Sequence, residues 1–191
     1  MEYDPDISIM EDENVYPPSE DSIFLIKCLN VRSGESVLEI GCGSGIVSLH
    51  CAKEGARVIA GDINLVAVEL TKKNAQINDL NLNVILTNVY ESISGTFDTI
   101  IFNLPYLPVE DDVPLGEAWS GGEDGLGPLP RLLEGAPKHG NPGWRVVIVV
   151  SSLMDDAGLG SLLLPYRVEV LGELPLFFEK LRVLQISADQ L

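Results

Sequence analysis

The sequence predicts an α/β fold: a doubly wound, mostly parallel sheet of seven strands, with helices on both faces and an antiparallel strand pair at the C-terminal end. Strand-like and helix-like segments alternate from residue 36 to residue 164, as parallel sheets with helical crossovers require. The most apolar strand segment, 144–151, is expected to be central. The last two strand segments are joined only by residues 172–176, a link typical of an antiparallel pair.

The chain is expected to consist of an N-terminal arm, residues 1–19, and a single domain, residues 20–191. The arm is acidic and contains three prolines, so it is predicted to be loosely packed, with a short strand at 7–10. Ser19 is predicted to cap the first helix, and the carboxylates of Glu20 and Asp21 suit the positive end of that helix dipole.

The remaining elements follow from hydrophobic periodicity. The predicted strands are 36–40, 57–60, 84–86, 97–102, 144–151, 166–171 and 177–185, and the predicted helices are 46–53, 65–78, 129–136 and 155–164. Residues 107–127 show neither period, and long irregular segments in compact domains are often functional.

The net charge of -17 restricts what the chain can bind. It comes from 29 acidic and 12 basic residues, and the longest basic run is the pair Lys72–Lys73. Proteins that bind nucleic acid neutralise phosphates with clustered bases, so no direct nucleic-acid contact is expected unless a basic partner subunit supplies it. Three cysteines and two histidines form neither a disulfide framework nor a metal site. No signal peptide or bilayer-spanning run is visible, so we expect a cytoplasmic protein without membrane contact.

The strand at 36–40 runs directly into a glycine-rich turn, Gly41-Cys42-Gly43-Ser44-Gly45, and a helix follows at once. Such a turn lets the backbone approach a ligand at the carboxyl end of a strand. The dinucleotide fingerprint needs a small residue where Ile46 stands, so that ligand is not favoured. Glu39 is placed to attract an ammonium group, which S-adenosylmethionine carries. A generic tight turn is the alternative.

A second acidic residue, Asp62, ends the next strand about twenty residues after the glycine turn. An acid in this position can accept hydrogen bonds from both hydroxyls of a ribose, as it does in NAD enzymes. A helix cap is the alternative for Asp62, although Asn64 is able to fill that role. Asn88 follows the third strand and is placed to meet the amino group of an adenine, but it is equally explained as a turn asparagine.

The fourth strand ends in Asn103-Leu104-Pro105-Tyr106, which is similar to the Asn-Pro-Pro-Tyr signature of amino-methylating enzymes. An amide or aromatic amine holds its lone pair in conjugation and is a poor nucleophile. The side-chain carbonyl of Asn103 and the backbone carbonyl of Leu104 can each accept one N–H and orient the nitrogen. Pro105 restricts the backbone, and Tyr106 can stack on a planar group. A proline-bearing turn is the alternative.

Together these motifs resemble the class I S-adenosylmethionine methyltransferases of the HemK-like protein-glutamine branch. Two further segments carry the resemblance: residues 15–22, similar to the family's Val-Tyr-x-Pro-x-Glu-Asp-Thr, and residues 118–125, typical of the small eukaryotic and archaeal members. The resemblance covers about residues 15–150. It implies a Rossmann-like fold and methylation of the glutamine in the Gly-Gly-Gln loop of a class I translation release factor.

The resemblance also implies a set of site residues and a partner. The residues implied at the cofactor are Ser22, Glu39, Gly41, Gly43, Gly45, Asp62, Asn88 and Asn103, and those implied at the acceptor amide are Asn103, Leu104, Pro105 and Tyr106. Family members work with a small zinc-binding activator protein. A positive mean hydropathy of +0.19 beside so high a charge agrees with an apolar patch left for such a partner.

Two residues depart from the family pattern. Leu104 stands where proline is usual, and Asn-Leu-Pro-Tyr also occurs in ribosomal-RNA adenine dimethylases, which are basic proteins. Asn88 stands where an acid is common. Three alternatives therefore remain beside glutamine methylation: an adenine methyltransferase acting on RNA or DNA, a protein lysine methyltransferase, and a cofactor-binding subunit without turnover.

Overall fold

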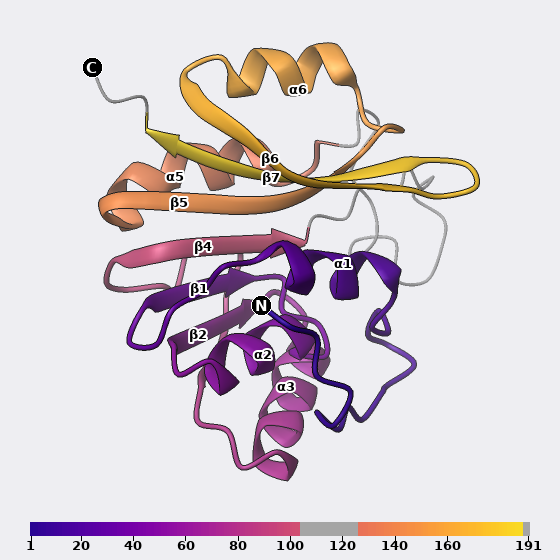
Figure 1. Cartoon of the computed structure of the whole chain (residues 1–191). Coiled ribbons are helices and arrows are strands. Elements are labelled where there is room, and N and C mark those ends of the chain that lie inside the picture. The colour runs from indigo at the N-terminus through magenta and orange to yellow at the C-terminus, as the bar shows by residue number, and fades with distance from the viewer. Residues whose placement is uncertain (104–125, 189–191) are drawn as a thin grey trace.

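A computed structural model describes residues 1–103 and 126–188, and it confirms the predicted fold class (Figure 1). The sheet has seven strands in the order β3-β2-β1-β4-β5-β7-β6. The elements of the described residues are α1 (Glu20–Cys28), β1 (Ser36–Ile40), α2 (Ile46–Lys53), β2 (Arg57–Asp62), α3 (Leu65–Ile77), β3 (Asn83–Leu86), β4 (Phe97–Asn103), α5 (Leu129–His139), β5 (Gly140–Ser151), α6 (Asp156–Leu163), β6 (Tyr166–Pro175) and β7 (Lys180–Ala188).

The first five strands are parallel, and the chain reverses direction across the sheet between β1 and β4. Ile40 of β1 lies opposite Gly61 of β2 on one side and opposite Phe102 of β4 on the other. β7 pairs antiparallel with both β5 and β6. α1, α2 and α3 lie on one face of the sheet and α5 and α6 on the other (Figure 1). Ligands of such sheets bind at the carboxyl ends of the strands where the order reverses.

The core lies along both faces of the central strands. Residues 146–150 of β5 are almost entirely buried, because α1 packs on one side of this strand and α5 on the other. The largest fully buried side chains include Leu25, Leu38, Ile100, Leu132 and Ile148. Within residues 1–103 and 126–188, no helix is long and apolar enough to cross a membrane.

The N-terminal arm packs against α3 instead of forming the predicted strand at residues 7–10. The amide of Asn78 pairs with the backbone of Ser8 at 2.8 and 2.7 Å, and the amide of Asn74 pairs with the backbone of Met10 at 2.8 and 3.1 Å. These two side chains, one helical turn apart, supply the hydrogen bonds that a neighbouring strand would otherwise provide. Ile7 is buried beside them, so the prediction of a loose arm is also wrong.

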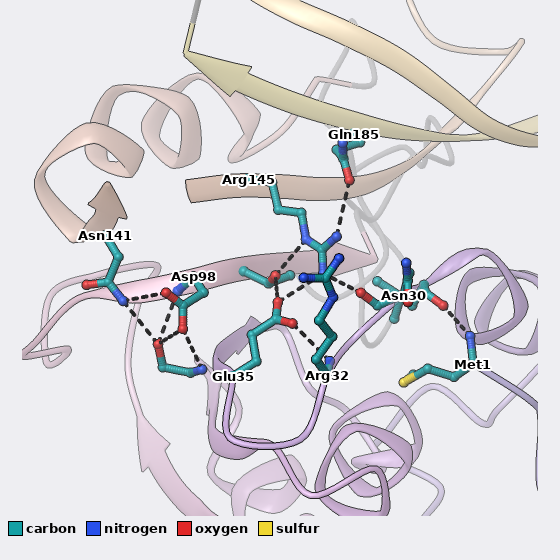
Figure 2. Close-up of polar contacts among 11 residues, drawn as sticks. Met1, Asn30, Arg32, Glu35, Asp98, Asn141, Arg145 and Gln185 are labelled. Carbon is teal, nitrogen blue, oxygen red and sulfur yellow. Dashed lines mark hydrogen bonds and ion pairs between the residues drawn. The ribbon is translucent and has the colours of Figure 1, made fainter. Parts of the chain in front are cut away.

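A polar cluster lies toward the amino ends of β4 and β5, opposite their carboxyl ends. Figure 2 shows the Arg145 guanidinium between Glu35 and Gln185. Its Nε donates to Thr99 Oγ1 at 2.8 Å, and its Nη2 lies 2.9 Å from Glu35 Oε1. Nη2 also donates to the backbone oxygen of Asn30 at 2.5 Å. Arg145 therefore ties β5 to β4, to β7 and to the segment before β1.

Candidate functional site

The turn between β1 and α2 is built on glycines that no other residue can replace without strain. Gly41, Gly43 and Gly45 have φ values of 66°, 54° and 84°. A Cβ added at Gly41 would lie 2.8 Å from the ring of Phe102, and one at Gly45 would lie 2.7 Å from Thr71. The turn is consequently folded tightly over the ends of β1 and β4, and Gly45 leads directly into the first turn of α2.

Glu39 is a buried acid at the end of β1. It is 2% exposed, and the hydroxyl of Ser48 on α2 donates a hydrogen bond to its Oε2. Burial raises the pKa of Glu39 to about 8, and the hydrogen bond from Ser48 offsets this only in part, while the charge of Asp62 adds to the rise. The carboxyl group is therefore ready to lose its proton to solvent when a positively charged ligand comes close.

Asp62 ends β2 and is tied into the glycine turn. Its Oδ2 accepts a hydrogen bond from the Gly43 N–H at 2.9 Å, and its Oδ1 accepts one from the Asn64 N–H at 2.8 Å. Burial raises the pKa of Asp62. The side chain of Asn64 caps α3 by accepting from the Val66 N–H at 2.9 Å. The helix-cap alternative for Asp62 is therefore excluded, and its carboxylate is fixed beside the turn.

Asn103, the last residue of β4, meets the start of α1. Its Nδ2 donates to Asp21 Oδ2 at 2.8 Å and lies 3.5 Å from Ser22 Oγ. A carboxylate only accepts, so this contact fixes which end of the Asn103 amide is the nitrogen. The other end, Oδ1, is buried, and no group among the described residues donates to it. An unpaired buried acceptor costs about 1–3 kcal/mol, so Oδ1 is a position where a donor is missing.

Asp21 is a buried residue beside Asn103 that the sequence did not single out as part of the site. The sequence suggested only a favourable charge at the start of a helix, and it assigned the capping role to Ser19. In the structure Ser19 makes no side-chain cap. Its hydroxyl instead donates to Asp21 Oδ1 at 2.6 Å, and the Ser22 N–H donates to the same oxygen at 2.7 Å. These bonds hold the buried Asp21 carboxylate rigidly against Asn103.

The predicted residues thus divide into those that meet and those that do not. Glu39, Gly41, Gly43, Gly45 and Asp62 surround the glycine turn, and Ser22 and Asn103 lie at the neighbouring end of β4. Among the described residues no hydrogen bond joins Asn88 to this group; its Oδ1 accepts from Arg131 Nη1 of α5 at 3.2 Å. Leu104, Pro105 and Tyr106, together with the segment 118–125, lie outside the described residues.

Comparison with known proteins agrees with this geometry. The model of the methyltransferase small domain family matches residues 8–114. A candidate protein N5-glutamine methyltransferase of Methanocaldococcus jannaschii is 40% identical over 177 residues, which are 89% of this chain and 90% of that protein. The release factor glutamine methyltransferase of Lactococcus lactis is 35% identical over 111 residues, covering 56% of this chain and 41% of that enzyme.

Solved structures show the same fold at lower identity. The Mtq2–Trm112 complex of E. cuniculi, described as responsible for methylation of the eRF1 translation termination factor, contains a chain with a TM-score of 0.73 at 19% identity; the match covers 92% of this chain and 99% of that one. A methyltransferase of Pyrococcus furiosus has a TM-score of 0.74 at 22% identity, covering 96% and 90%. The sequence matches and the site geometry together place the chain in the methyltransferase small domain family.

Proposed function

We propose that this chain is an S-adenosylmethionine-dependent N-methyltransferase whose acceptor is the glutamine of the Gly-Gly-Gln motif in a class I translation release factor. The observation that carries the proposal is the buried Oδ1 of Asn103, which lacks a donor among the described residues and is aimed by Asp21. A primary amide of the acceptor offers the N–H that this oxygen needs. The 40% identical relative named for glutamine methylation supports the same acceptor.

In this proposal the acceptor nitrogen is activated by orientation. Asn103 Oδ1 accepts one N–H of the glutamine amide, and the backbone carbonyl of Leu104 accepts the second. Pro105 and Tyr106 complete the acceptor site by restricting the backbone and stacking on the planar amide. With both N–H groups fixed, the nitrogen lone pair is turned toward the methyl donor, which converts a poor nucleophile into a well-placed one.

The residues around the glycine turn suit the cofactor's chemical groups. Glu39 would neutralise the ammonium group, and Asp62 would accept the ribose hydroxyls, while Gly41, Gly43 and Gly45 let the backbone come close. When bound, S-adenosylmethionine would supply the methyl group: its S–CH3 bond would break as the N–CH3 bond forms, S-adenosylhomocysteine would leave, and the amide nitrogen would give up one N–H proton to solvent. Ser22 would line the pocket between cofactor and acceptor. Asn88 Oδ1 already accepts from Arg131, and its second lone pair could accept from the adenine amino group.

The chain is further proposed to act as a heterodimer with a small zinc-binding activator protein. Ile63, Leu65 and Leu86 are exposed by 60%, 58% and 47%, at the end of β2, the start of α3 and the end of the edge strand β3. Apolar side chains gathered along a sheet edge are typical of a protein contact. The E. cuniculi relative was solved with a protein partner. A double variant with Leu65→Ser and Leu86→Ser should no longer co-purify with that activator. The activator should also increase the solubility of this variant less than that of the wild-type chain.

A methyl-transfer assay tests the proposed function. The chain is mixed with radiolabelled S-adenosylmethionine and either a release factor or ribosomal RNA, with and without the activator. Asn103→Ala should abolish transfer to the release factor while cofactor affinity is nearly unchanged. Asp62→Ala should act mainly by lowering the affinity for the cofactor. Transfer to RNA alone, with the steep salt dependence of phosphate contacts, would overturn the assignment of the acceptor.

A further inference from the structure

The tip of the β6–β7 hairpin exposes two neighbouring aromatic side chains. Phe177 and Phe178 are exposed by 92% and 85%, and their ring centroids lie 4.7 Å apart with planes at 84°. Burying a phenylalanine side chain is worth about 1.5–3 kcal/mol, and here two rings gain almost none of it within the chain. The backbone turn closes without them, because the Leu176 N–H donates to the Glu179 oxygen at 2.8 Å. The fold therefore does not account for these two side chains.

The hairpin tip projects on the same side of the sheet as the carboxyl ends of β1 and β4 (Figure 1). Leu181 at the start of β7 lies opposite Ser151 at the end of β5. The hydroxyl of Ser151 donates to Glu179, and the backbones of Ser152 and Lys180 are joined at 2.9 Å. The base of the tip is thus fixed to the end of β5, the strand next to β4.

The hairpin also packs against α1, the helix that carries Asp21. Gly172 of β6 lies so close to α1 that a Cβ there would sit 2.7 Å from Cys28 Sγ and 3.2 Å from the ring of Phe24. Glu179 is near enough to Tyr16 for its charge to add to the rise in the phenol's pKa, whose largest cause is burial. The position of the tip relative to Asn103 is therefore set by direct contacts and not by a flexible link.

The register gives the separation between the tip and Asn103. Asn103 lies opposite Val149, and Val149 lies opposite Val183, so β7 is two strands away from β4. With strands about 4.8 Å apart and about 3.3 Å per residue from Val183 back to Phe178, the two sites are about 20 Å apart. The rings cannot touch a glutamine held by Asn103. A folded partner can reach both, since a standard interface buries about 800 Å² per side and is wider than this distance.

We infer that Phe177 and Phe178 are a docking anchor for the methyl-accepting protein, binding an apolar depression on its positively charged surface about 20 Å from the accepting residue. The inference rests on the proposed function. The positive charge expected on the partner's surface follows from the net charge of -17 of this chain. The proposed activator site lies along β3, at the opposite edge of the sheet, and leaves the tip free.

The test compares two variants of the chain in its complex with the activator. One carries both Phe177→Ser and Phe178→Ser, and the control carries Leu164→Ser alone. Leu164 is exposed by 83% but precedes Tyr166, at the far end of β6 from the tip, so it controls for the loss of exposed apolar surface. Steady-state methylation of a folded release factor and direct binding to it are measured for each. The double variant should raise KM and the dissociation constant at least about ten-fold, as loss of aromatic interface anchors does, with kcat, cofactor affinity and unfolding midpoint unchanged.

Each other outcome overturns the inference. Unchanged KM and binding in the double variant, or an equal loss in Leu164→Ser, would show that the tip is not an anchor. Loss of self-association on sedimentation, or loss of the activator from the complex, would assign the rings to another partner. If the wild-type protein methylates no glutamine, the proposed function fails by itself. The direct binding measurement then still decides whether the release factor docks on these rings.

Discussion

Replacing Glu39 with glutamine should make the stability of the cofactor-free protein less sensitive to pH. Burial raises the pKa of Glu39 to about 8 in the folded chain, from 4.5 for an exposed glutamate. The folded state therefore holds this proton more tightly than the unfolded state. The stability that protonated Glu39 contributes is fully present below about pH 4.5 and is lost as the pH rises through about 8. Glutamine keeps the shape and an acceptor for Ser48 but does not titrate.

The magnitude follows from the two pKa values. Between about pH 6 and about pH 8.5, Glu39 should reduce the free energy of unfolding by about 2.5 kcal/mol. Urea unfolding of the wild-type protein and Glu39→Gln at these two pH values measures it, because the difference between the proteins cancels the titration of all other groups. The wild-type protein should lose about 2.5 kcal/mol more than the variant. Parallel pH dependence would refute the argument, because Glu39 would then titrate at the same pH in both states.

The proton held by Glu39 should be released to solvent when the cofactor binds. At about pH 7 most Glu39 is protonated, so binding of a cationic ammonium beside it should release about one proton. Calorimetry in buffers of different ionisation enthalpy measures this release. It should be absent in Glu39→Gln, which should also bind the cofactor more weakly. Equal proton release in both proteins would remove Glu39 from the ammonium site.

Three further substitutions test other parts of the structure. Asp21→Asn should lower kcat for methyl transfer at least about ten-fold with little change in cofactor affinity, because the side-chain amide of Asn103 is then free to rotate and exchange its oxygen and nitrogen. An unchanged kcat would show that Asn103 does not need Asp21 to orient it. Arg145→Met should lower the free energy of unfolding by about 3 kcal/mol, whereas loss of the exposed Lys72–Glu69 pair in Lys72→Met should cost under about 0.5 kcal/mol, both by urea unfolding. Gly45→Ala should lower the free energy of unfolding more than Gly143→Ala does. Both glycines have φ above 80°, but only a Cβ at position 45 would meet Thr71. Equal losses would show that this contact has no effect on stability.

Much of the sheet and the glycine turn could be predicted because local sequence determines them. The alternation of apolar strands and helical segments sets the parallel order, and positive φ at three closely spaced positions requires glycine. The place of Asn64 after Asp62 allows it to cap the next helix, and the structure shows that it does. In each case the controlling interaction joins residues that are close in the sequence.

The features that escaped prediction depend on residues far apart in the sequence. Asp21 and Asn103 are 82 positions apart, and they meet only because α1 packs across the end of β4. The arm needed Asn74 and Asn78 to replace the partner strand that residues 7–10 lack.

The C-terminal hairpin shows a different limit. Phe177 and Phe178 continue an apolar run, which predicts that the last strand begins at Phe177. The structure places both in the turn, and β7 begins at Lys180. Hydrophobicity alone does not distinguish a buried strand from an exposed binding tip, because both need apolar side chains.

Peptide masses show directly whether this site methylates a protein glutamine. The chain, with the activator, is incubated with S-adenosylmethionine and a class I release factor, which is then digested and mapped. One added methyl group is expected on the Gly-Gly-Gln glutamine, and none is expected with Asn103→Ala. With cofactor binding verified, an unmodified glutamine, or a methyl group found on lysine instead, would contradict this expectation.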